Sequence, residues 1–166
     1  HKVGSVCDPV LFEGDFKYTS TPSEVITDPE VDIVFICTPN YLIRDLVVGA
    51  RDNGKHVFAE KPPEISSHQV KDMIAAESRK KKKKLMFGFN HRYHESIKTA
   101  KSHIDSGEFG RILWMRGRYG KSVDDEFYNN WRSKKEKAGG GILMDQGIHM
   151  LDLLIYFANG FDEVKS

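Results

Sequence analysis

Four polar segments of the chain each follow an apolar run, and their side chains are suited to hydrogen bonding or proton transfer. They are Asp8, Thr38-Pro39-Asn40, Glu60-Lys61-Pro62 and Asn90-His91-Arg92. In an open α/β sheet, ligands bind beyond the carboxyl ends of the parallel strands, which share one edge. If the four apolar runs are parallel strands, we therefore expect these segments to lie along one candidate site.

Lys61 is the sharpest candidate, because it lies between a predicted strand end and Pro62-Pro63. The prolines restrict the backbone, and a lysine held there could act as an acid or base or stabilise negative charge. An exposed turn lysine paired with Glu60 explains the same spacing equally well. Asp8 also has two explanations. Its carboxylate could accept hydrogen bonds from a ribose 2′-hydroxyl, or Asp8-Pro9 simply starts a turn.

A second candidate site lies on one predicted helix. Asp145, His149 and Asp152 are spaced by four and three residues, which places them on one helical face. A carboxylate one turn from an imidazole can fix its tautomer, which suits a general base. Two structural explanations stay open: Asp145 could stabilise the positive helix N-terminus, and His149 could be a hydrogen-bonded core histidine. The spacing completes no metal site, so we predict no bound metal.

The composition of the 166 residues argues against a membrane-spanning protein and against a small disulfide-stabilised scaffold. Lys and Arg number 25 against 24 Asp and Glu, a net charge of +1, and 39% of residues are apolar. No run approaches the roughly 20 apolar residues of a membrane helix, so we expect no membrane partner. Because the chain opens directly into a strand-like pattern, we expect no signal peptide. The two cysteines, Cys7 and Cys37, suit a reduced cytoplasmic protein better than a disulfide scaffold.

Two further segments have competing explanations. The basic run 79–84 could bind nucleic acid, but without its 6 cations the chain has 19 basic and 24 acidic residues, a balance of −5. Because the run also falls at a predicted helix C-terminus, we favour a solvated helix end and predict no nucleic-acid partner. Trp131-Arg132, with Tyr128, could clamp a sugar ring or a phosphate, or could simply pack.

The alternation of apolar runs and capping signals predicts an α/β fold. We expect a parallel, doubly wound sheet built as β-α-β-α-β-α-β, in which the run 31–37 is buried on both faces. After Gly110 the pattern changes to an amphipathic strand of an antiparallel sheet over 111–121. A helix over about 142–158 follows three glycines. The expected strands are 3–8, 31–37, 55–59 and 85–89, and the expected helices are 21–27, 40–53, 66 to the lysine run, and 95–106.

These segments, taken in order, resemble the Gfo/Idh/MocA family, the glucose–fructose oxidoreductase and inositol dehydrogenase-like NAD(P)-dependent enzymes. The resemblance covers nearly the whole chain, and although each piece is weak, the ordered set is specific. The segments that carry it are 31–40 ending in Thr-Pro-Asn, Gly54-Lys55-His56-Val57 leading to Glu60-Lys61-Pro62, Gly88-Phe89-Asn90 with Arg92-Tyr93, 104–112, and 139–141 through Asp145, Gly147, His149 and Asp152.

The resemblance implies two domains. Residues 1–90 would form a dinucleotide-binding domain with an incomplete Rossmann-like sheet, and residues 91–166 the start of an α+β substrate domain on an open antiparallel sheet. The family's loop Gly-x-Gly-x-x-Gly does not occur in these 166 residues, and we expect it to precede His1. Family members often carry a histidine where this chain has Ile43.

The resemblance also implies site residues and a function. The cofactor would be NAD, with NADP as the second choice because a charged Asp8 disfavours a 2′-phosphate. The implied reaction is hydride transfer between this cofactor and a hydroxyl or keto carbon of a sugar, polyol or nucleotide sugar. The alternative is a non-catalytic dinucleotide sensor or regulator, and we expect the full-length form to be a homo-oligomer. The implied residues are Lys61, Asp145 and His149 for catalysis; Asp8, Thr38, Pro39, Asn40, Glu60 and Lys61 for the cofactor; and Arg92, Tyr93, Trp131 and Arg132 for the substrate.

Overall fold

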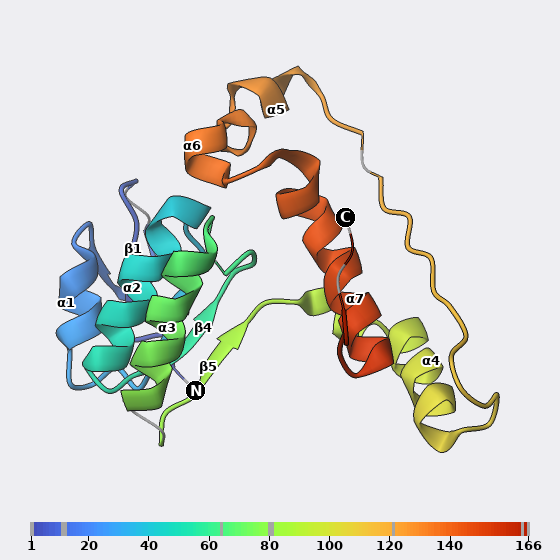
Figure 1. The fold of residues 1–166 in the computed structure, drawn as a ribbon. Coiled ribbons are helices and arrows are strands. Elements are labelled where there is room, and N and C mark those ends of the chain that lie inside the picture. The colour runs from blue at the N-terminus through green and yellow to red at the C-terminus, as the bar shows by residue number, and fades with distance from the viewer. Residues whose placement is uncertain are drawn as a thin grey trace. The chain divides into compact units, whose positions relative to one another are not determined.

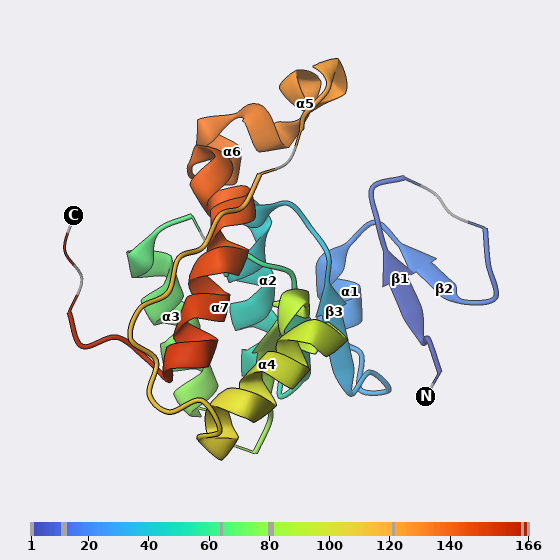
Figure 2. The same cartoon turned by 90° about the vertical axis from the view of Figure 1, so that its right-hand side faces the viewer.

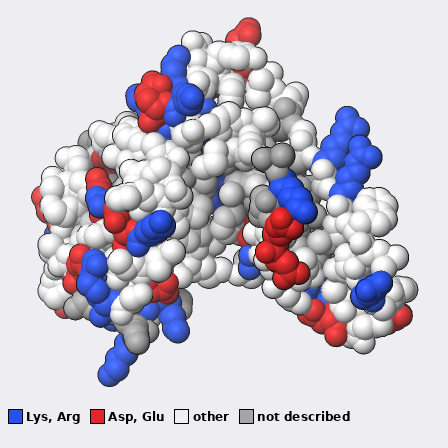
Figure 3. Space-filling model, viewed as in Figure 1, with Lys and Arg blue, Asp and Glu red and all other residues white. Residues whose placement is uncertain are grey.

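The computed structural model describes residues 2–10, 13–63, 65–79, 82–120, 122–163 and 165. It divides into two compact units, which we call unit 1 (His1–Gly88) and unit 2 (Phe89–Ser166) and describe separately (Figure 1). Acidic and basic side chains are interspersed on the visible face of both units (Figure 3). Among the described residues, none of the helices combines the length and the apolar character that crossing a lipid bilayer requires.

In the described residues, unit 1 has two parallel sheets instead of the single predicted sheet. Strand β1 (Ser5–Cys7) pairs with β2 (Lys17–Thr19), and this pair is set apart from β3 (Figure 2). The other sheet has the order β3-β4-β5. The sequence pattern missed β2, because three residues are too few to show a period of two. The strands of the second sheet are β3 (Ile33–Ile36), β4 (His56–Ala59) and β5 (Leu85–Phe87).

The helices of unit 1 lie where the capping signals predict them, although their caps differ. Thr21 and Pro39 precede their helices without a side-chain cap hydrogen bond. Ser66, by contrast, does cap its helix, since its Oγ accepts the Gln69 N–H at 3.4 Å. Gly54 has φ +73°, a left-handed conformation that favours glycine after a helix. The helices are α1 (Pro22–Thr27), α2 (Asn40–Asp52) and α3 (Ser67–Arg79), and residues 80–81 of the basic run lie outside the described residues.

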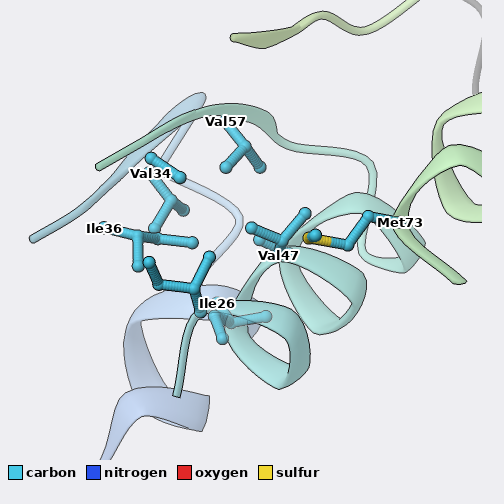
Figure 4. Close-up of a cluster of buried hydrophobic side chains, with 9 residues drawn as sticks. Ile26, Val34, Ile36, Val47, Val57 and Met73 are labelled. Atoms are coloured by element: carbon cyan, nitrogen blue, oxygen red, sulfur yellow. The ribbon is translucent and has the colours of Figure 1, made fainter. Parts of the chain in front are cut away.

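The core of unit 1 fills the space between its second sheet and the helices. Val34 and Ile36 from β3 and Val47 from α2 lie in one buried cluster (Figure 4). Burying such side chains contributes roughly 1.5–3 kcal/mol each. The opposite face of β3 is not covered, since Ile33 is 46% and Phe35 68% exposed. The prediction of a strand buried on both faces is therefore wrong for the described residues.

Unit 2 is helical in the described residues. Helix α4 (Glu95–Ser106) has the predicted bounds and ends at Gly107, whose φ is +73°. The predicted C-terminal helix begins with a π-helical turn, η3 (Leu143–Gly147), and continues as α7 (Ile148–Ala158). The short helices are the 3₁₀-helix η1 (Asn90–Tyr93), α5 (Asp125–Asn129), the 3₁₀-helix η2 (Trp131–Ser133) and α6 (Lys135–Ala138).

The strand predicted over 111–121 does not form in residues 111–120, and Lys121 lies outside the described residues. A strand is stabilised by hydrogen bonds to a neighbouring strand, and no described residue of unit 2 provides one. The segment packs instead against α7. A Cβ on Gly117 would overlap Cγ and Sδ of Met150, so any larger residue there would force the Met150 side chain to move.

Candidate active site

Three of the predicted polar segments leave the second sheet of unit 1 at one edge. Ile36, Ala59 and Phe87 are register partners at the strand ends. The Glu60 N–H donates to the Ile36 carbonyl at 2.9 Å, and the Gly88 N–H donates to the Ala59 carbonyl at 2.8 Å. The residues after β3, β4 and β5 therefore start at the same level. We call this row of residues the carboxyl edge; it comprises Cys37, Thr38, Glu60, Lys61 and Gly88.

Glu60 and Lys61 are held at the carboxyl edge by their own backbone. The Glu60 Oε2 accepts the backbone N–H of Lys61 at 3.2 Å. Pro62, the next residue, is fully buried and anchors the segment, while Lys61 itself is half-buried. A Cβ on Gly88 would lie 3.5 Å from Glu60 Oε2, so the glycine leaves room for the carboxylate. The anchored backbone limits where the lysine side chain can reach.

Thr38 carries a polar atom that nothing in the described part of the chain satisfies. Its Oγ1 is buried and makes no hydrogen bond to the described residues. Leaving a buried polar atom unpaired costs about 1–3 kcal/mol, so a ligand group at this point would gain a hydrogen bond. Pro39 follows, and Asn40, 6% exposed, is the first residue of α2. The carboxyl edge therefore offers a ligand one buried hydroxyl that no described residue satisfies.

Cys37 lies beside Glu60 on the same edge. The surrounding protein raises the pKa of the Cys37 thiol, and the negative charge of Glu60 raises it further. The pKa of Cys7 is raised for a similar reason, first by burial and then by the charges of Asp8 and Glu24. Both thiols are free.

Asp8 lies at the end of the other sheet of unit 1. Its Oδ1 accepts the Val10 N–H at 2.8 Å, and the Tyr18 hydroxyl donates to its carbonyl oxygen. The carboxylate therefore makes the Asp-Pro turn that the sequence offered as one explanation. Because β1 pairs with β2, Asp8 does not share the hydrogen-bonded sheet of Lys61.

In unit 2, His149 is buried among aromatic rings. It is 5% exposed. Its ring centroid lies 4.0 Å from that of His91 and 6.3 Å from that of Tyr119, which is stacked on it at 23°. Phe89 meets it edge-on at 6.4 Å. We call Phe89, His91 and Tyr119 the ring cluster around His149.

An ion pair attaches the ring cluster to α7. The guanidinium of Arg92 donates twice to Asp152, from Nε to Oδ2 at 2.8 Å and from Nη2 to Oδ1 at 2.5 Å. It also lies 5.0 Å from the ring centre of Tyr156. The Asp152 carboxylate raises the pKa of Arg92. Because Arg92 follows His91 in η1, the pair holds His91 against His149.

The remaining predicted residues of unit 2 lie in the π-helical turn, at the end of η1 and in η2. Asp145 is in the π-helical turn, where its Oδ2 accepts the Gln146 side-chain N–H at 2.9 Å. Tyr93 is 57% exposed. The Arg132 guanidinium covers the Trp131 ring at 4.6 Å, so these two residues form one stacked surface in η2.

Sequence reasoning did not assign roles to the ring cluster. His91 stood in a polar segment without a role, and Phe89 is only the residue before that segment. Tyr119 gave no signal, because it follows His91 by 28 positions in a segment with a strand-like pattern. These rings come from parts of unit 2 that are far apart in the sequence and meet only when the unit is folded. No local spacing in the sequence therefore predicts their contact. Among the described residues, no group of acidic, histidine and cysteine side chains could hold a metal ion.

Comparison with known proteins shows which protein family the chain matches. Residues 11–89 match a family model described as "Oxidoreductase family, NAD-binding Rossmann fold", and residues 97–166 match the "GFO/IDH/MocA C-terminal domain". Together they cover most of the chain. The chain belongs to the Gfo/Idh/MocA family of oxidoreductases, and its unit 1 has the Rossmann-like fold of that family.

Several curated relatives are dehydrogenases of small sugars and polyols. The chain is 35% identical to levoglucosan dehydrogenase of Pseudarthrobacter phenanthrenivorans over 89% of its own length and 38% of the relative's. It is 30% identical to D-glucoside 3-dehydrogenase of Escherichia coli, over 98% of its length and 48% of the relative's. It is 33% identical to scyllo-inositol 2-dehydrogenase (NAD(+)) of Bacillus subtilis, over 84% and 39%. The chain thus spans less than half the length of these relatives.

Solved structures give the same result. A levoglucosan dehydrogenase in complex with NADH and levoglucosan matches with a TM-score of 0.80 and 35% identity, over 85% of this chain and 38% of that one. Myo-inositol 2-dehydrogenase from Lactobacillus plantarum matches with a TM-score of 0.76 and 28% identity, over 86% and 42%.

Proposed function

We propose that this chain supplies the cofactor-binding edge and the acid–base residues of an NAD-dependent dehydrogenase of sugars or polyols. The observation that carries the proposal is His149, a buried imidazole fixed by aromatic rings and by the Arg92–Asp152 pair. A proton acceptor held in one place in this way is pre-organised for acid–base catalysis. The family match and the relatives support the oxidoreductase class.

In this proposal, residues 1–90 form the dinucleotide-binding domain and residues 91–166 begin the substrate domain. The cofactor would lie along the carboxyl edge, where the buried Thr38 hydroxyl fits a ligand oxygen. NAD supplies the hydride acceptor for the reaction. The proposed cofactor-binding residues are Asp8, Thr38, Pro39, Asn40, Glu60 and Lys61.

We propose one catalytic role for each of the three residues that the family resemblance implies. His149 takes the proton of the substrate hydroxyl that is oxidised. The ammonium group of Lys61 holds the same oxygen and stabilises its developing negative charge. Asp145 orients the imidazole or the substrate. Tyr93, exposed at the end of η1, and the stacked Trp131 and Arg132 offer hydrogen bonds and an apolar surface to a sugar ring.

The experiment is a turnover assay of the full-length protein with NAD or NADP. The substrates are levoglucosan, D-glucosides, scyllo- and myo-inositol and a nucleotide sugar, and reduced cofactor is followed by its absorbance. We expect oxidation of at least one sugar or polyol, with NAD preferred. If the protein binds the cofactor but oxidises none of these substrates, the proposed dehydrogenase activity would be contradicted. That result would favour a non-catalytic dinucleotide sensor. We also propose a homo-oligomer, which light scattering on the same sample measures.

A further inference from the structure

We propose that Tyr119 is a positioning residue, which holds His91 as a neutral imidazole against the face of His149. Tyr119 lies at the end of the extended segment 111–120, to which the sequence assigned only a strand. The inference rests on the proposed function in one respect, since its catalytic consequence requires His149 to be the base. Its structural content can be measured without turnover.

The hydrogen bonds of His91 select one tautomer. Its Nδ1 lies 3.0 Å from the Asn90 side-chain oxygen, which can only accept, so the ring proton must be on Nδ1. Its Nε2 lies 3.2 Å from the Tyr119 hydroxyl. In a neutral ring with its proton on Nδ1, Nε2 has a lone pair and accepts from that hydroxyl. The amide and the hydroxyl are both uncharged, so neither of these two hydrogen bonds favours the imidazolium as a carboxylate would, and in this proposal His91 stays neutral.

A neutral His91 matters because of its distance from His149. The two ring centroids are 4.0 Å apart. Positive charges on both rings at that separation would repel each other in a partly buried site. When His91 stays neutral, His149 can accept a proton without this repulsion. In this arrangement the Tyr119 hydroxyl donates to Nε2, so protonation of Nε2 would require the hydroxyl to turn and accept instead.

Three contacts fix Tyr119 in its position. Its ring stacks on His149 at an interplanar angle of 23° and meets the His91 ring edge-on at 5.6 Å. Two residues earlier, Gly117 lies directly against Met150 of α7, where any side chain would overlap. The close approach at Gly117 brings the segment across α7, so Tyr119 reaches both imidazoles at once.

The test is long-range ¹H–¹⁵N NMR of the 166-residue chain labelled at histidine nitrogens, which distinguishes the two imidazole tautomers. We expect a single Nδ1–H tautomer for His91. In Tyr119→Phe the ring remains but the hydroxyl is lost, and we expect at least a third of His91 to change to the Nε2–H tautomer. The matched control is Trp114→Phe, a 77% exposed ring of the same segment, which should leave His91 unchanged.

Two results would overturn the proposal: an Nε2–H tautomer in the unaltered chain, or an unchanged tautomer in Tyr119→Phe. If Tyr119→Phe does not fold, Asn90→Ala provides the second variant. Without the Asn90 acceptor, the Tyr119 hydroxyl can still donate to Nε2, so part of His91 should keep the Nδ1–H form. Complete conversion to the Nε2–H form in that variant would show that Asn90 alone fixes the tautomer and would contradict the proposal.

In the full-length enzyme, Tyr119→Phe should lower kcat about tenfold and change KM less than twofold, because orientation of the base matters most in the transition state. An equal loss in Trp114→Phe would contradict a positioning role. If the full-length protein oxidises no substrate but the tautomer responds as expected, then the proposed function fails and the hydrogen-bonded arrangement of His91 and Tyr119 stands.

Discussion

The two units hold their reactive side chains by different means. In unit 1, the carboxyl edge is set by backbone register, since hydrogen bonds between β3, β4 and β5 bring the strand ends to one level. In unit 2, side-chain contacts set the position of His149, which is held by ring contacts and by the Arg92–Asp152 ion pair. We therefore expect that the side chains of the carboxyl edge can be replaced with little change in stability, whereas those around His149 support both the fold and the site.

Among the substitutions proposed for the two units, Lys61→Ala in the full-length protein should have the largest effect on turnover. Loss of the ammonium group should lower turnover at least about 100-fold, the low end for lost acid–base assistance. Lys61 is half-buried, and its backbone N–H keeps its bond to Glu60, so the midpoint of urea unfolding should stay nearly unchanged. Steady-state kinetics and urea titration of the same preparation measure both quantities.

Lys71→Ala is the matched control, because Lys71 is an exposed lysine of α3 in the same unit. It should change neither turnover nor stability. Near-normal activity of Lys61→Ala would remove Lys61 from the active site. A large loss of stability would show that unit 1 depends on its edge side chains after all.

In unit 2, the corresponding test is Asp152→Ala, which removes a carboxylate that is 7% exposed. The doubly bonded Arg92 then loses both acceptors. Because a hydrogen bond to a charged group is worth about 1.5–3 kcal/mol and Arg92 is partly open to water, we expect a loss of about 2 kcal/mol. The free energy of unfolding in urea, followed by the near-ultraviolet circular dichroism of the aromatic side chains, measures this loss.

Glu95→Ala is the control for the loss of an ion pair. Glu95 pairs with Lys98 at 2.7 Å, but its side chain is 87% exposed. Exposed pairs contribute little, so the loss should stay below about 0.5 kcal/mol. If both substitutions cost the same, the Arg92–Asp152 pair does not hold η1 on α7, and the contrast between the two units fails.

The same contrast explains how much the sequence could predict. Strand ends, glycines and prolines are local signals in the sequence. They predict that Thr38, Glu60 and Lys61 lie at one edge of the sheet. They also gave α4 its bounds, because Gly107 ends that helix. Properties carried by the backbone appear in the sequence as periods and breaks.

Side-chain contacts between distant elements leave no such signal. The ring cluster around His149 brings together η1, the segment 111–120 and α7. Its contacts form only when unit 2 is folded. The pairing of Arg92 with Asp152, 60 positions apart, is of the same kind. The strand predicted at 111–121 shows the converse error: its residues have a strand's pattern, but a partner strand decides whether one forms.

A smaller effect is expected at Thr38, where backbone register places a buried hydroxyl without a partner in the described chain. Thr38→Val removes the unpaired group and keeps the shape. Stability should stay equal or rise by up to about 1 kcal/mol, because no hydrogen bond is lost. The affinity for NADH, measured by fluorescence in the full-length protein, should fall about fivefold, the equivalent of one neutral hydrogen bond.

Thr27→Val is the comparison for this substitution. The Thr27 hydroxyl donates to the Ser23 carbonyl at 2.8 Å, so its removal should cost up to about 1 kcal/mol and leave NADH binding unchanged. If Thr38→Val destabilised the protein more than Thr27→Val, then the Thr38 hydroxyl would have an internal structural role. Its place among the cofactor ligands would then lose its support.

The smallest expected effect concerns the charge of Glu60 at the carboxyl edge. Because the pKa of Cys37 is raised, less of it is thiolate at pH 8, and iodoacetamide should alkylate it more slowly than a free thiol. Glu60→Gln removes the lesser of the two causes, so the pKa falls partway and the rate should rise by less than about threefold. Cys7 is the internal control, since its pKa depends on burial, Asp8 and Glu24. Mass spectrometry resolves the two sites, and an equal rise at both, or none at Cys37, would contradict the placement of Glu60 beside Cys37.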